Sequence, residues 1–437
     1  MEITSRMMVK PVYSEPHPLV GEKVPLTVFD RAAVDIFVPM VLAYPAPGPS
    51  NEALKAIAPC PALAGRLAVD QLGRRFLHVN NEGVLLIEAA VPVDLADVLL
   101  DDRTTRVDYL YPSTPEVREF LCLIKISRVR NLGRPLLQIQ LSRFKCGGLV
   151  VGICFHHHAA DGHSMSMFLT AWATAVREGN DFITTPPLLH RATTAVPRRT
   201  PTPVFDHRSL EFRCGEGDAY AVVPMGRIKN ITVHFTAEFV ADLKARVGAR
   251  CTTFQCLLAH VWKKITVARG LQPEEFTKVR VAVNCRGRAD PPVPMNFFGN
   301  MVLWAFPRLQ VRDVLNSSYG SVVDTIRNAV AHIDGEYVQS FLDFGRVADA
   351  NGEELIATAA PAGSMLCPDA EVDSWLGFSF HQLDFGTGAP AFFLPPDLPV
   401  EVLMFFVPSH KANGGVHLFI AIAEDHVTAF EQICYLI

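Results

Sequence analysis

Long apolar runs are absent from this 437-residue sequence, because no stretch approaches the ~20 consecutive apolar residues that a membrane-spanning helix needs. The most apolar candidate, residues 400–407, is much shorter. Residues 1–20 contain no long apolar segment of the kind found in secretion signals. We therefore expect a cytoplasmic protein that has no membrane partner.

Paired cysteines and an excess of basic charge are also missing. The ten cysteines have irregular spacing with no Cys-x-x-Cys pair, and most stand among apolar residues, as Cys154 does in GICF. We expect reduced core thiols rather than a disulfide framework. The formal net charge is −5, with acids and bases interspersed, so the chain has no basic stripe for nucleic acid or anionic lipid.

The sequence does contain enough apolar residues for two cores. Hydrophobic residues make up 49% and charged residues 19% of the chain, a composition typical of globular proteins. The clearest break in composition is the stretch 184–208, which is rich in proline and threonine and predicts a crossover linker. We predict an N-terminal domain over 1–183 and a C-terminal domain over 209–437, both α/β with mixed sheets and helices.

Strand and helix patterns surround one cluster of histidines. LLQIQLSRF and LVVGICF, joined by Gly147 and Gly148, predict a buried hairpin. The stretch 164–177 predicts a helix that ends at Gly179, and FHHHAADGHS lies between strand and helix. Beyond the linker, the patterns predict helices over 235–248, 252–270 and 322–333, and strands beginning at Val279, Trp375 and Leu418.

The segment FHHHAADGHS concentrates polar groups at the end of a buried strand, where an unpartnered side chain costs on the order of 1 to 3 kcal/mol. A histidine with a pKa near ~6.5 can take a proton from an attacking amine or hydroxyl, which favours a catalytic base. A structural cluster and a metal site are the alternatives. Consecutive strand residues face opposite sides, which argues against one ion binding all three adjacent histidines. The metal ligands would come from His156, His157, His158, Asp161 and His163.

Two motifs make the sequence similar to a known family. HHAADG at 157–162 resembles the HxxxDG motif of the BAHD acyltransferases, and DFGTG at 384–388 resembles their second signature, DFGWG, with threonine replacing tryptophan. The resemblance extends over the whole chain through PLTVFD near the start, the crossover, AVNCRGR at 282–288 and NFFGN at 296–300. CPDAEVDSW and LDFGTG are most similar to the amine-acylating branch that makes hydroxycinnamoyl amides in grasses.

This resemblance implies two chloramphenicol acetyltransferase-like domains with an active-site channel between them. His157 matches the general base of the motif, and Asp161 matches its structural carboxylate, for which Arg286 is the expected partner. The oxyanion donor is not identified, and Trp375 and Thr387 are the candidates. The second signature implies a loop remote from the chemistry that supports the fold and CoA binding; it comprises Asp384, Phe385, Gly386, Thr387 and Gly388.

The acceptor site is predicted from two acids. Glu371 and Asp373 are two residues apart on an expected strand, so both carboxylates face one side and are able to converge on one cation. A solvated strand face is the alternative. The resemblance aligns this segment, with Trp375, to an acceptor-lining strand. Paired acids favour agmatine or putrescine as the acceptor, and tryptamine or serotonin is the other possibility.

Contacts with CoA are expected at two places. A helix start offers backbone amides to a phosphate, and a polar loop after a strand offers cationic and amide side chains. A purely structural turn is equally compatible with either segment. The candidate residues are Thr252, Thr253, Asn284 and Arg288.

Together, the residues and the resemblance predict transfer of a hydroxycinnamoyl or benzoyl group from its CoA thioester to a primary amine. The acyl-CoA is a co-substrate. No permanently bound cofactor and no metal are expected, and nothing demands a dimer, so we expect a monomer. Three rivals stay open: an O-acyltransferase with a hydroxyl acceptor such as shikimate, a condensation-type domain fed by carrier proteins, and a non-catalytic binding protein. DFGTG weighs against the second rival.

Overall fold

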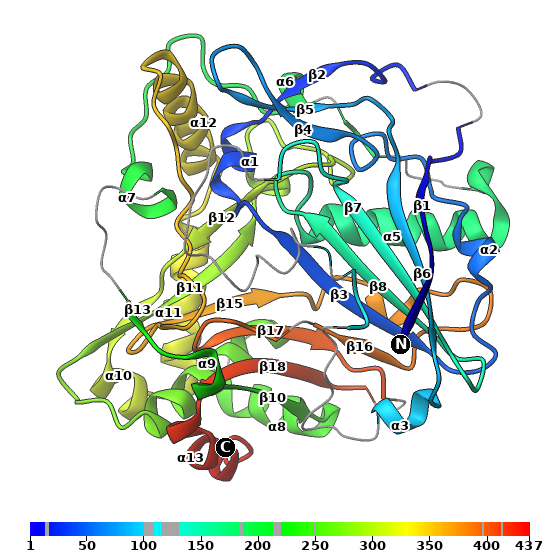
Figure 1. Ribbon diagram of the computed structural model, residues 1–437. Coiled ribbons are helices and arrows are strands. Elements are labelled where there is room, and N and C mark those ends of the chain that lie inside the picture. Colours follow the sequence, from blue (N-terminus) through cyan, green and yellow to red (C-terminus); the bar gives the residue numbers. More distant parts are fainter. Residues whose placement is uncertain are drawn as a thin grey trace.

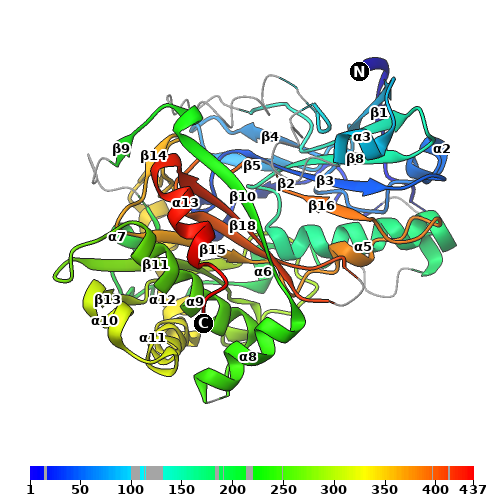
Figure 2. The same cartoon turned by 90° about the horizontal axis from the view of Figure 1, so that it is seen from below.

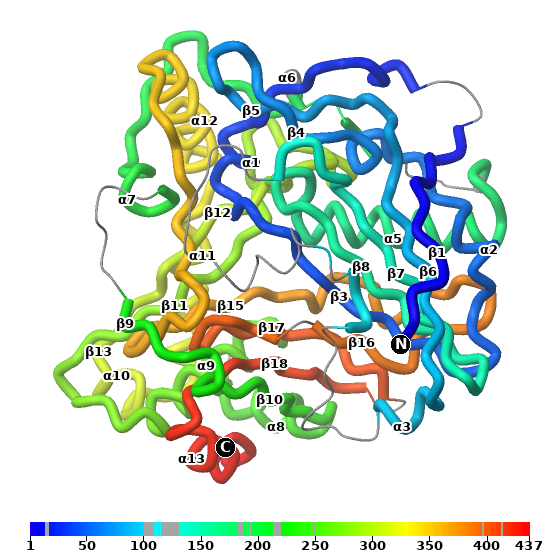
Figure 3. The backbone as a smooth tube through the Cα atoms, in the orientation of Figure 1, coloured from blue at the N-terminus to red at the C-terminus, as the bar shows by residue number. Residues whose placement is uncertain are grey.

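Two mixed β-sheets lie side by side and are covered by helices (Figure 1). The structure is a computed structural model that describes residues 1–13, 17–99, 109–112, 114, 131–182, 187–189, 191–212, 220–248, 250–395, 397–411 and 414–437. Among these residues, no helix combines the length and the apolar character that crossing a bilayer requires. The N-terminus lies beside the first sheet and the C-terminus follows the last helix, beside the second sheet (Figure 3).

The first sheet has the strand order β1-β6-β7-β8-β3-β16. Strands β7 and β8 form the predicted hairpin, and every residue of β8 is buried, as its uninterrupted apolar run predicts. Helix α5 packs its apolar face into the same core as these strands. The bounds are β1 (Glu2–Val9), β3 (Phe37–Tyr44), β6 (Val84–Val91), β7 (Leu137–Phe144), β8 (Leu149–His156), β16 (Phe392–Leu394) and α5 (Gly162–Glu178).

Short elements complete this half of the molecule. A small sheet of order β2-β5-β4 lies beside the first sheet, and the remaining helices before the crossover are short. The bounds are β2 (Lys23–Pro25), β4 (Arg66–Val69), β5 (Arg75–His78), α1 (Val28–Ala32), α2 (Asn51–Leu54) and α3 (Leu95–Leu99).

The second sheet has the order β10-β18-β17-β15-β11-β12, and β13 also pairs with β11. Its strands are β10 (Ile228–Phe235), β11 (Phe276–Asn284), β12 (Val302–Ala305), β13 (Arg308–Gln310), β15 (Ala370–Ser374), β17 (Leu403–Pro408) and β18 (Val416–Ala423). Helices α8 (Ala237–Val247), α9 (Thr253–Ala268), α10 (Val311–Asn316), α11 (Tyr319–Ala331) and α13 (Glu424–Ile433) gather on one side of this sheet (Figure 2). The other elements are α6 (Arg191–Thr194), α7 (His207–Glu211), α12 (Gly335–Ala350) and the paired strands β9 (Ala221–Val222) and β14 (Ser364–Met365).

The strands β11 and β15 are buried on one face and partly exposed on the other. Val281 of β11 and Val372 of β15 face the helices and are buried. Their neighbours in sequence point the opposite way because side chains alternate along a strand. Arg280, Glu371 and Asp373 therefore share the second, partly exposed face, which we call the open face of the second sheet.

Two predictions about the chain need correction. The strand expected to begin at Trp375 does not form, because β15 already ends at Ser374 and the chain then turns into the 3-10 helix Phe380–Gln382. The apolar residues of WLGFSF pack as an aromatic cluster instead. The crossover is also not a purely irregular linker. It contains α6 and pairs through Leu188 with Phe297, although residues 184–186 and 190 lie outside the described part of the chain.

The two sheets do not correspond to two continuous stretches of sequence. Strand β16 comes from the predicted C-terminal domain, yet Phe393 pairs with Leu42 in β3 of the first sheet. Trp375 and Phe380 likewise pack into the core that lies under the first sheet. The segment between β15 and β17 thus returns to the first sheet and carries side chains from one half of the molecule to the other.

Candidate active site

The candidate active site begins where strand β8 ends and helix α5 begins. His156 is the last residue of β8, and the backbone amide of His157 donates a hydrogen bond to the carbonyl of Ile36 at 2.9 Å. Asp161 then caps α5, because its carboxylate accepts a hydrogen bond from the amide of Ser164 at 2.8 Å. Such a cap satisfies amides that the first turn of a helix leaves unpaired. The turn thereby fixes His157 and Asp161 close to each other.

The ring of His157 is oriented by one amide side chain. Its Nδ1 lies 3.1 Å from Oδ1 of Asn300. Nδ2 of Asn300 donates to the backbone carbonyl of His157 at 2.8 Å and to Oδ1 of Asp30 at 3.0 Å. Since these two acceptors occupy the amide N–H groups, Oδ1 of Asn300 faces the ring and only accepts. Nδ1 of His157 therefore carries the ring proton, and Nε2 keeps its lone pair.

A buried ion pair holds Asn300 in place. Asp30, in α1, is fully buried, and its Oδ1 lies 3.0 Å from the guanidinium group of Arg191 in α6. Arg191 also donates a hydrogen bond to the carbonyl of Ala159, within the turn that carries His157. Helix α1, the crossover and the turn are thus joined around the imidazole.

The surroundings of His157 favour the neutral ring. Burial lowers the pKa of His157 below its ordinary value, and the nearby charge of Asp161 opposes this effect. The side chain is still partly exposed, and Nε2 has no hydrogen-bond partner among the residues that the structure describes. A neutral imidazole with an unoccupied Nε2 is the form that a general base requires.

The carboxylate of Asp161 is occupied by hydrogen-bond partners within the protein. Arg286 binds it in a bidentate pair, with distances of 2.8 Å to Oδ2 and 3.1 Å to Oδ1. The amides of Ser164 and Met301 supply two further hydrogen bonds. Although burial opposes ionisation, Arg286 and these amides hold the pKa of Asp161 below its usual range. Both partners of this ion pair are buried, which gives the pair a structural character.

His156 and His158 face away from His157 and meet Asp35. His156 accepts a hydrogen bond at Nδ1 from the amide of His158, so its Nε2 carries the proton that reaches Asp35 Oδ1 at 3.1 Å. Arg75 lies 2.7 Å from the other oxygen of Asp35, and Nε2 of His158 lies 3.2 Å from the carbonyl oxygen of Ala33. Asp35, His156 and His158 lie close enough together to be considered as metal ligands.

These contacts do not favour a metal at that position. A metal ion needs lone pairs from its ligands, whereas the lone pairs of Asp35 already accept contacts from Arg75, from the amide of Asn131 and from His156. The guanidinium group of Arg75 would also repel a divalent cation. Burial lowers the pKa of His158 to about 3. A neutral ring is itself compatible with metal binding, so the contacts of Asp35 and the charge of Arg75 are what disfavour the ion. The expectation of a site without a metal stays a prediction.

On the open face of the second sheet, the two predicted acceptor acids have different surroundings. Oε2 of Glu371 lies 3.3 Å from Nη1 of Arg280, its neighbour on β11. The carboxylate of Asp373 has no hydrogen bond or ion pair among the described residues. Burial and the charge of Glu371 raise its pKa to about 7, and the charge of Arg280 opposes this shift. The prediction that both acids converge on one external cation stays a prediction, and Glu371 already has one cation within the protein.

An aromatic cluster connects the open face to the start of α5. Trp375, two residues after Asp373, lies 4.7 Å from Phe405 and 6.3 Å from Phe378, measured between ring centroids. Phe378 packs so closely on Gly162 that a β-carbon there would come within 2.9 Å of its ring. The glycine of HxxxDG therefore allows the aromatic cluster to approach the turn that carries His157. Trp375 stays a candidate oxyanion donor, and no contact tests it.

The DFGTG loop lies at the opposite end of α5. Arg177 donates a hydrogen bond to the carbonyl of Asp384 at 2.7 Å, and Phe385 packs edge-on against Trp172 at 4.8 Å. Arg177 is 16 residues beyond Asp161, which is about 24 Å along the helix axis at 1.5 Å per residue. Thr387 is exposed in this loop at the end of α5 remote from His157, which argues against it as the oxyanion donor. Asp384 holds the loop by accepting hydrogen bonds from the amides of Gly386 and Gly388.

The four residues predicted to contact CoA make interactions within the protein that support its structure. Thr252 caps α9 in a reciprocal arrangement with Gln255, and Thr253 is the first residue of that helix. Asn284 accepts a hydrogen bond from Arg286 at 3.2 Å. Arg288 donates to two carbonyls at the end of α11. None of these contacts tests CoA binding, which stays a prediction for all four residues.

Sequence reasoning did not identify the residues that surround the predicted ones. Asn300 and Asp30 stand in NFFGN and PLTVFD, which carry part of the family resemblance, but neither was given a role. Arg191 and Arg280 had no signal in the sequence, since arginines in linkers and strands usually face solvent. Their partners lie 161 and 91 positions away in sequence, respectively.

Comparisons with known proteins identify the family of this chain. A family model described as "Transferase family" matches residues 1–437. Tryptamine benzoyltransferase 1 of Oryza sativa subsp. japonica is 59% identical over 100% of this chain and 97% of its own length. Tryptamine hydroxycinnamoyltransferase 2 of the same plant is 53% identical over 100% of this chain and 98% of its own length. Agmatine hydroxycinnamoyltransferase 1, also from this plant, is 35% identical, covering 100% and 99%.

Solved structures share the fold. Vinorine synthase has a TM-score of 0.67 at 20% identity, covering 98% of this chain and 96% of its own. F. graminearum TRI101, complexed with ethyl coenzyme A, has a TM-score of 0.74 at 16% identity, covering 94% and 97%. The predicted two-part α/β fold is therefore confirmed.

Proposed function

This chain belongs to the BAHD acyltransferases, and we propose that it transfers a benzoyl or hydroxycinnamoyl group from its CoA thioester to an aromatic primary amine of the tryptamine type. The observation that carries the proposal is the fixed imidazole of His157, whose Nε2 is left with its lone pair. The acyl-CoA is a co-substrate, and the proposed chemistry requires no resident cofactor.

The reaction uses this nitrogen twice. The bound ammonium ion first loses one proton to solvent. The neutral amine that results attacks the thioester carbonyl, so a C–N bond forms and Nε2 of His157 takes the second proton that the nitrogen releases. The tetrahedral intermediate then collapses, the C–S bond breaks, and the CoA thiolate leaves with the electron pair. The imidazolium returns its proton to the sulfur, so the enzyme regains its starting form. The amide of Asn300 holds the ring in one tautomer throughout, and Asp161 with Arg286 holds the turn.

Asp373 is the group that we assign to the acceptor amine. An aliphatic amine with a pKa near ~10 arrives as an ammonium ion, which a carboxylate binds by charge-assisted hydrogen bonds. Asp373 has no other partner among the described residues. Phe405 is its register neighbour on β17, and Trp375 packs on Phe405, so aromatic surface adjoins the carboxylate. An indole ring fits such surroundings.

A single unpaired acid supports a monoamine rather than a diamine. Agmatine and putrescine carry a second cationic end, for which the open face offers only Glu371, already paired with Arg280. The higher identity to tryptamine acyltransferases than to an agmatine acyltransferase points in the same direction. A hydroxyl acceptor such as shikimate would leave Asp373 without a partner.

A CoA-release assay tests the proposal. Purified protein is given benzoyl-CoA or p-coumaroyl-CoA with tryptamine, agmatine, putrescine or shikimate, and His157→Ala serves as the control. We expect release with tryptamine that disappears in the variant. Turnover with shikimate alone would replace the proposal by O-acyl transfer. A clear preference for agmatine or putrescine would overturn the assignment of a monoamine acceptor.

A further inference from the structure

Arg280 is placed unusually for an arginine in the middle of a sheet. It lies on β11 directly opposite Glu371 of β15 in the parallel register, and both residues are on the open face. Its side chain is only 14% exposed, and that of Glu371 20% exposed. A cation and an anion in this partly buried position interact more strongly than on the surface, because water screens them less.

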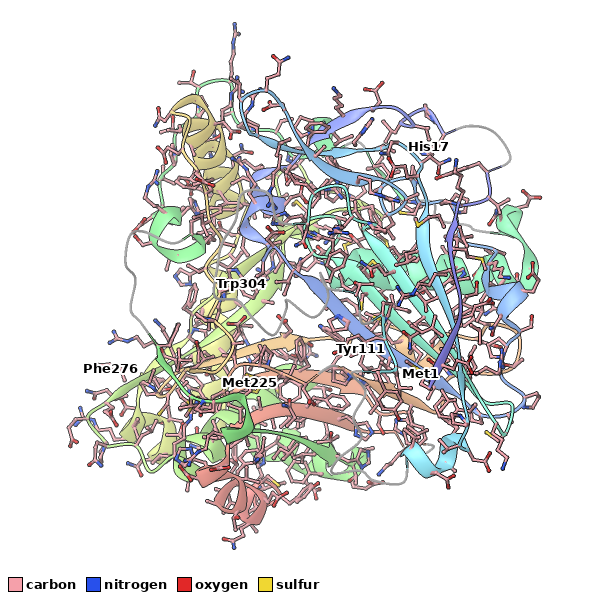
Figure 4. All side chains as sticks on the ribbon, in the orientation of Figure 1. Met1, His17, Tyr111, Met225, Phe276 and Trp304 are labelled. Atoms are coloured by element: carbon pink, nitrogen blue, oxygen red, sulfur yellow. The ribbon has the colours of Figure 1, made fainter. Side chains whose placement is uncertain are left out.

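Three sets of contacts hold the guanidinium group. Nη1 lies 3.3 Å from Oε2 of Glu371 and donates to the carbonyl of Thr358 at 3.1 Å. The guanidinium carbon lies 3.7 Å from the ring centroid of Trp304, so its face packs on the indole. Trp304 stands on β12, beside β11 (Figure 4). Nε is buried and has no hydrogen-bond partner in the described part of the chain. The position of Arg280 is thus set by Glu371, Thr358 and Trp304.

We propose that Arg280 is a specificity-determining residue of the acceptor site. It supplies from within the protein the cation that neutralises Glu371, and it leaves Asp373 as the single anion for an incoming ammonium ion. The residue does not touch the reacting atoms. It selects acceptors by their charge, and the inference rests on the proposed transfer to an aromatic amine.

The chemical consequence is a filter against acceptors with two cationic ends. An amine that carries a guanidinium or a second ammonium group would need Glu371 for that end. In this chain the acid is occupied, and the positive charge of Arg280 repels a second cation at close range. Binding is thus disfavoured both by a missing partner and by a like charge, which is how selective sites reject a competitor. A monocationic aromatic amine needs no second acid, and at Asp373 the charge of Arg280 is offset by Glu371.

The test compares agmatine with tryptamine in Arg280→Met, which keeps an apolar stem against Trp304 but removes the charge. We expect the ratio of kcat/KM for agmatine over tryptamine to rise about tenfold to hundredfold, the effect of one hydrogen bond between charged groups. In the double variant Arg280→Met with Glu371→Gln, the ratio of kcat/KM for agmatine over tryptamine should no longer rise. Arg308→Met is the matched control, because Arg308 stacks on Phe276 at 3.9 Å on the exposed edge near β13.

The outcomes separate this inference from the proposed function. An unchanged ratio in a folded Arg280→Met enzyme that acylates tryptamine overturns the role of Arg280 but leaves the function standing. A wild-type enzyme that acylates no amine overturns the function itself. If Arg280→Met does not fold, the Glu371→Gln variant alone tests the role of Arg280. It frees Arg280 to pair with Asp373, so the KM for tryptamine should rise several-fold with little change in kcat, and an unchanged KM overturns the inference.

Discussion

The carboxylates at the turn after β8 and on the open face of the second sheet have opposite surroundings. Asp161 accepts hydrogen bonds from Arg286 and from two backbone amides, and it is buried. Asp373 is partly exposed and has no such partner among the described residues. The pKa values move accordingly, below the ordinary value for Asp161 and up to about 7 for Asp373. A carboxylate whose partners are all internal builds the site, whereas one without partners is available to a ligand.

The same contrast separates the nitrogens of His157. Nδ1 forms a hydrogen bond with Asn300, whereas Nε2 forms none with any described residue. Internal contacts therefore set the geometry of the turn and leave one atom for the substrate. On the open face, Arg280 and Glu371 neutralise each other and leave one carboxylate for the substrate. Each region thus offers a single unoccupied group, a base in one and an anion in the other.

The largest effect is expected from removing the base. His157→Ala should lower kcat by about 10²- to 10⁴-fold, the usual contribution of a general base, with the melting temperature nearly unchanged. His163→Ala is the matched control from the same segment, since Nε2 of His163 lies 2.9 Å from the carbonyl oxygen of Met295 and not from a catalytic group. Steady-state kinetics with thermal unfolding measures both. Equal losses in the two variants would contradict the role of His157.

Breaking the internal pair of the turn should act on stability. Arg286→Met leaves the buried charge of Asp161 without its cation, which costs about 3 to 5 kcal/mol when one partner of a buried pair is removed. Chemical denaturation measures the loss. Adding Asp161→Asn to this variant should restore part of it, because the stranded charge is then gone. A destabilisation below about 1 kcal/mol would show that the pair is not structural.

Removing the unpartnered acid should act on the acceptor instead. Asp373→Asn should lower kcat/KM for tryptamine about tenfold to hundredfold, the effect of losing one charged hydrogen bond, with stability kept. Burial and Glu371 raise the pKa of Asp373 to about 7, so the wild-type kcat/KM should fall as the pH drops through about 7 and the carboxylate gains a proton. The ratio of the wild-type and variant pH profiles cancels the ionisation of the amine. A flat ratio would contradict the role of Asp373.

The smallest effect is expected at the far end of α5. Thr387→Ala should leave kcat and KM within about twofold of the wild type, because Thr387 is exposed in the loop that Arg177 contacts, and Arg177 is about 24 Å along the helix from Asp161. Phe385→Ala serves as the contrast, because Phe385 is buried against Trp172 and its loss should cost about 3 to 5 kcal/mol of stability. A large loss of kcat in Thr387→Ala would mean that this loop reaches the chemistry.

Local pattern predicted the parts of the site that lie in one stretch of chain, and the family resemblance also predicted the distant pairing of Asp161 with Arg286. An apolar run followed by His157 and Asp161 is visible as a buried strand that ends in a polar turn. The contacts that complete the site join distant segments, such as Arg280 with Glu371, whose meeting depends on the register of β11 and β15. Periodicity also cannot distinguish a short buried strand from an aromatic cluster, and for that reason the strand expected at Trp375 was wrong.

The most direct test of the central claim is a competition between three acceptors for one acyl-CoA. Equal concentrations of tryptamine, tryptophol and agmatine are mixed with the enzyme, and the acylated products are measured by mass spectrometry. Tryptophol has the same indole as tryptamine but a neutral hydroxyl, and agmatine has the amine with a second cation. The account predicts acyl-tryptamine as the main product, with this preference over tryptophol reduced in Asp373→Asn. A main product from tryptophol or agmatine in the wild type would contradict it.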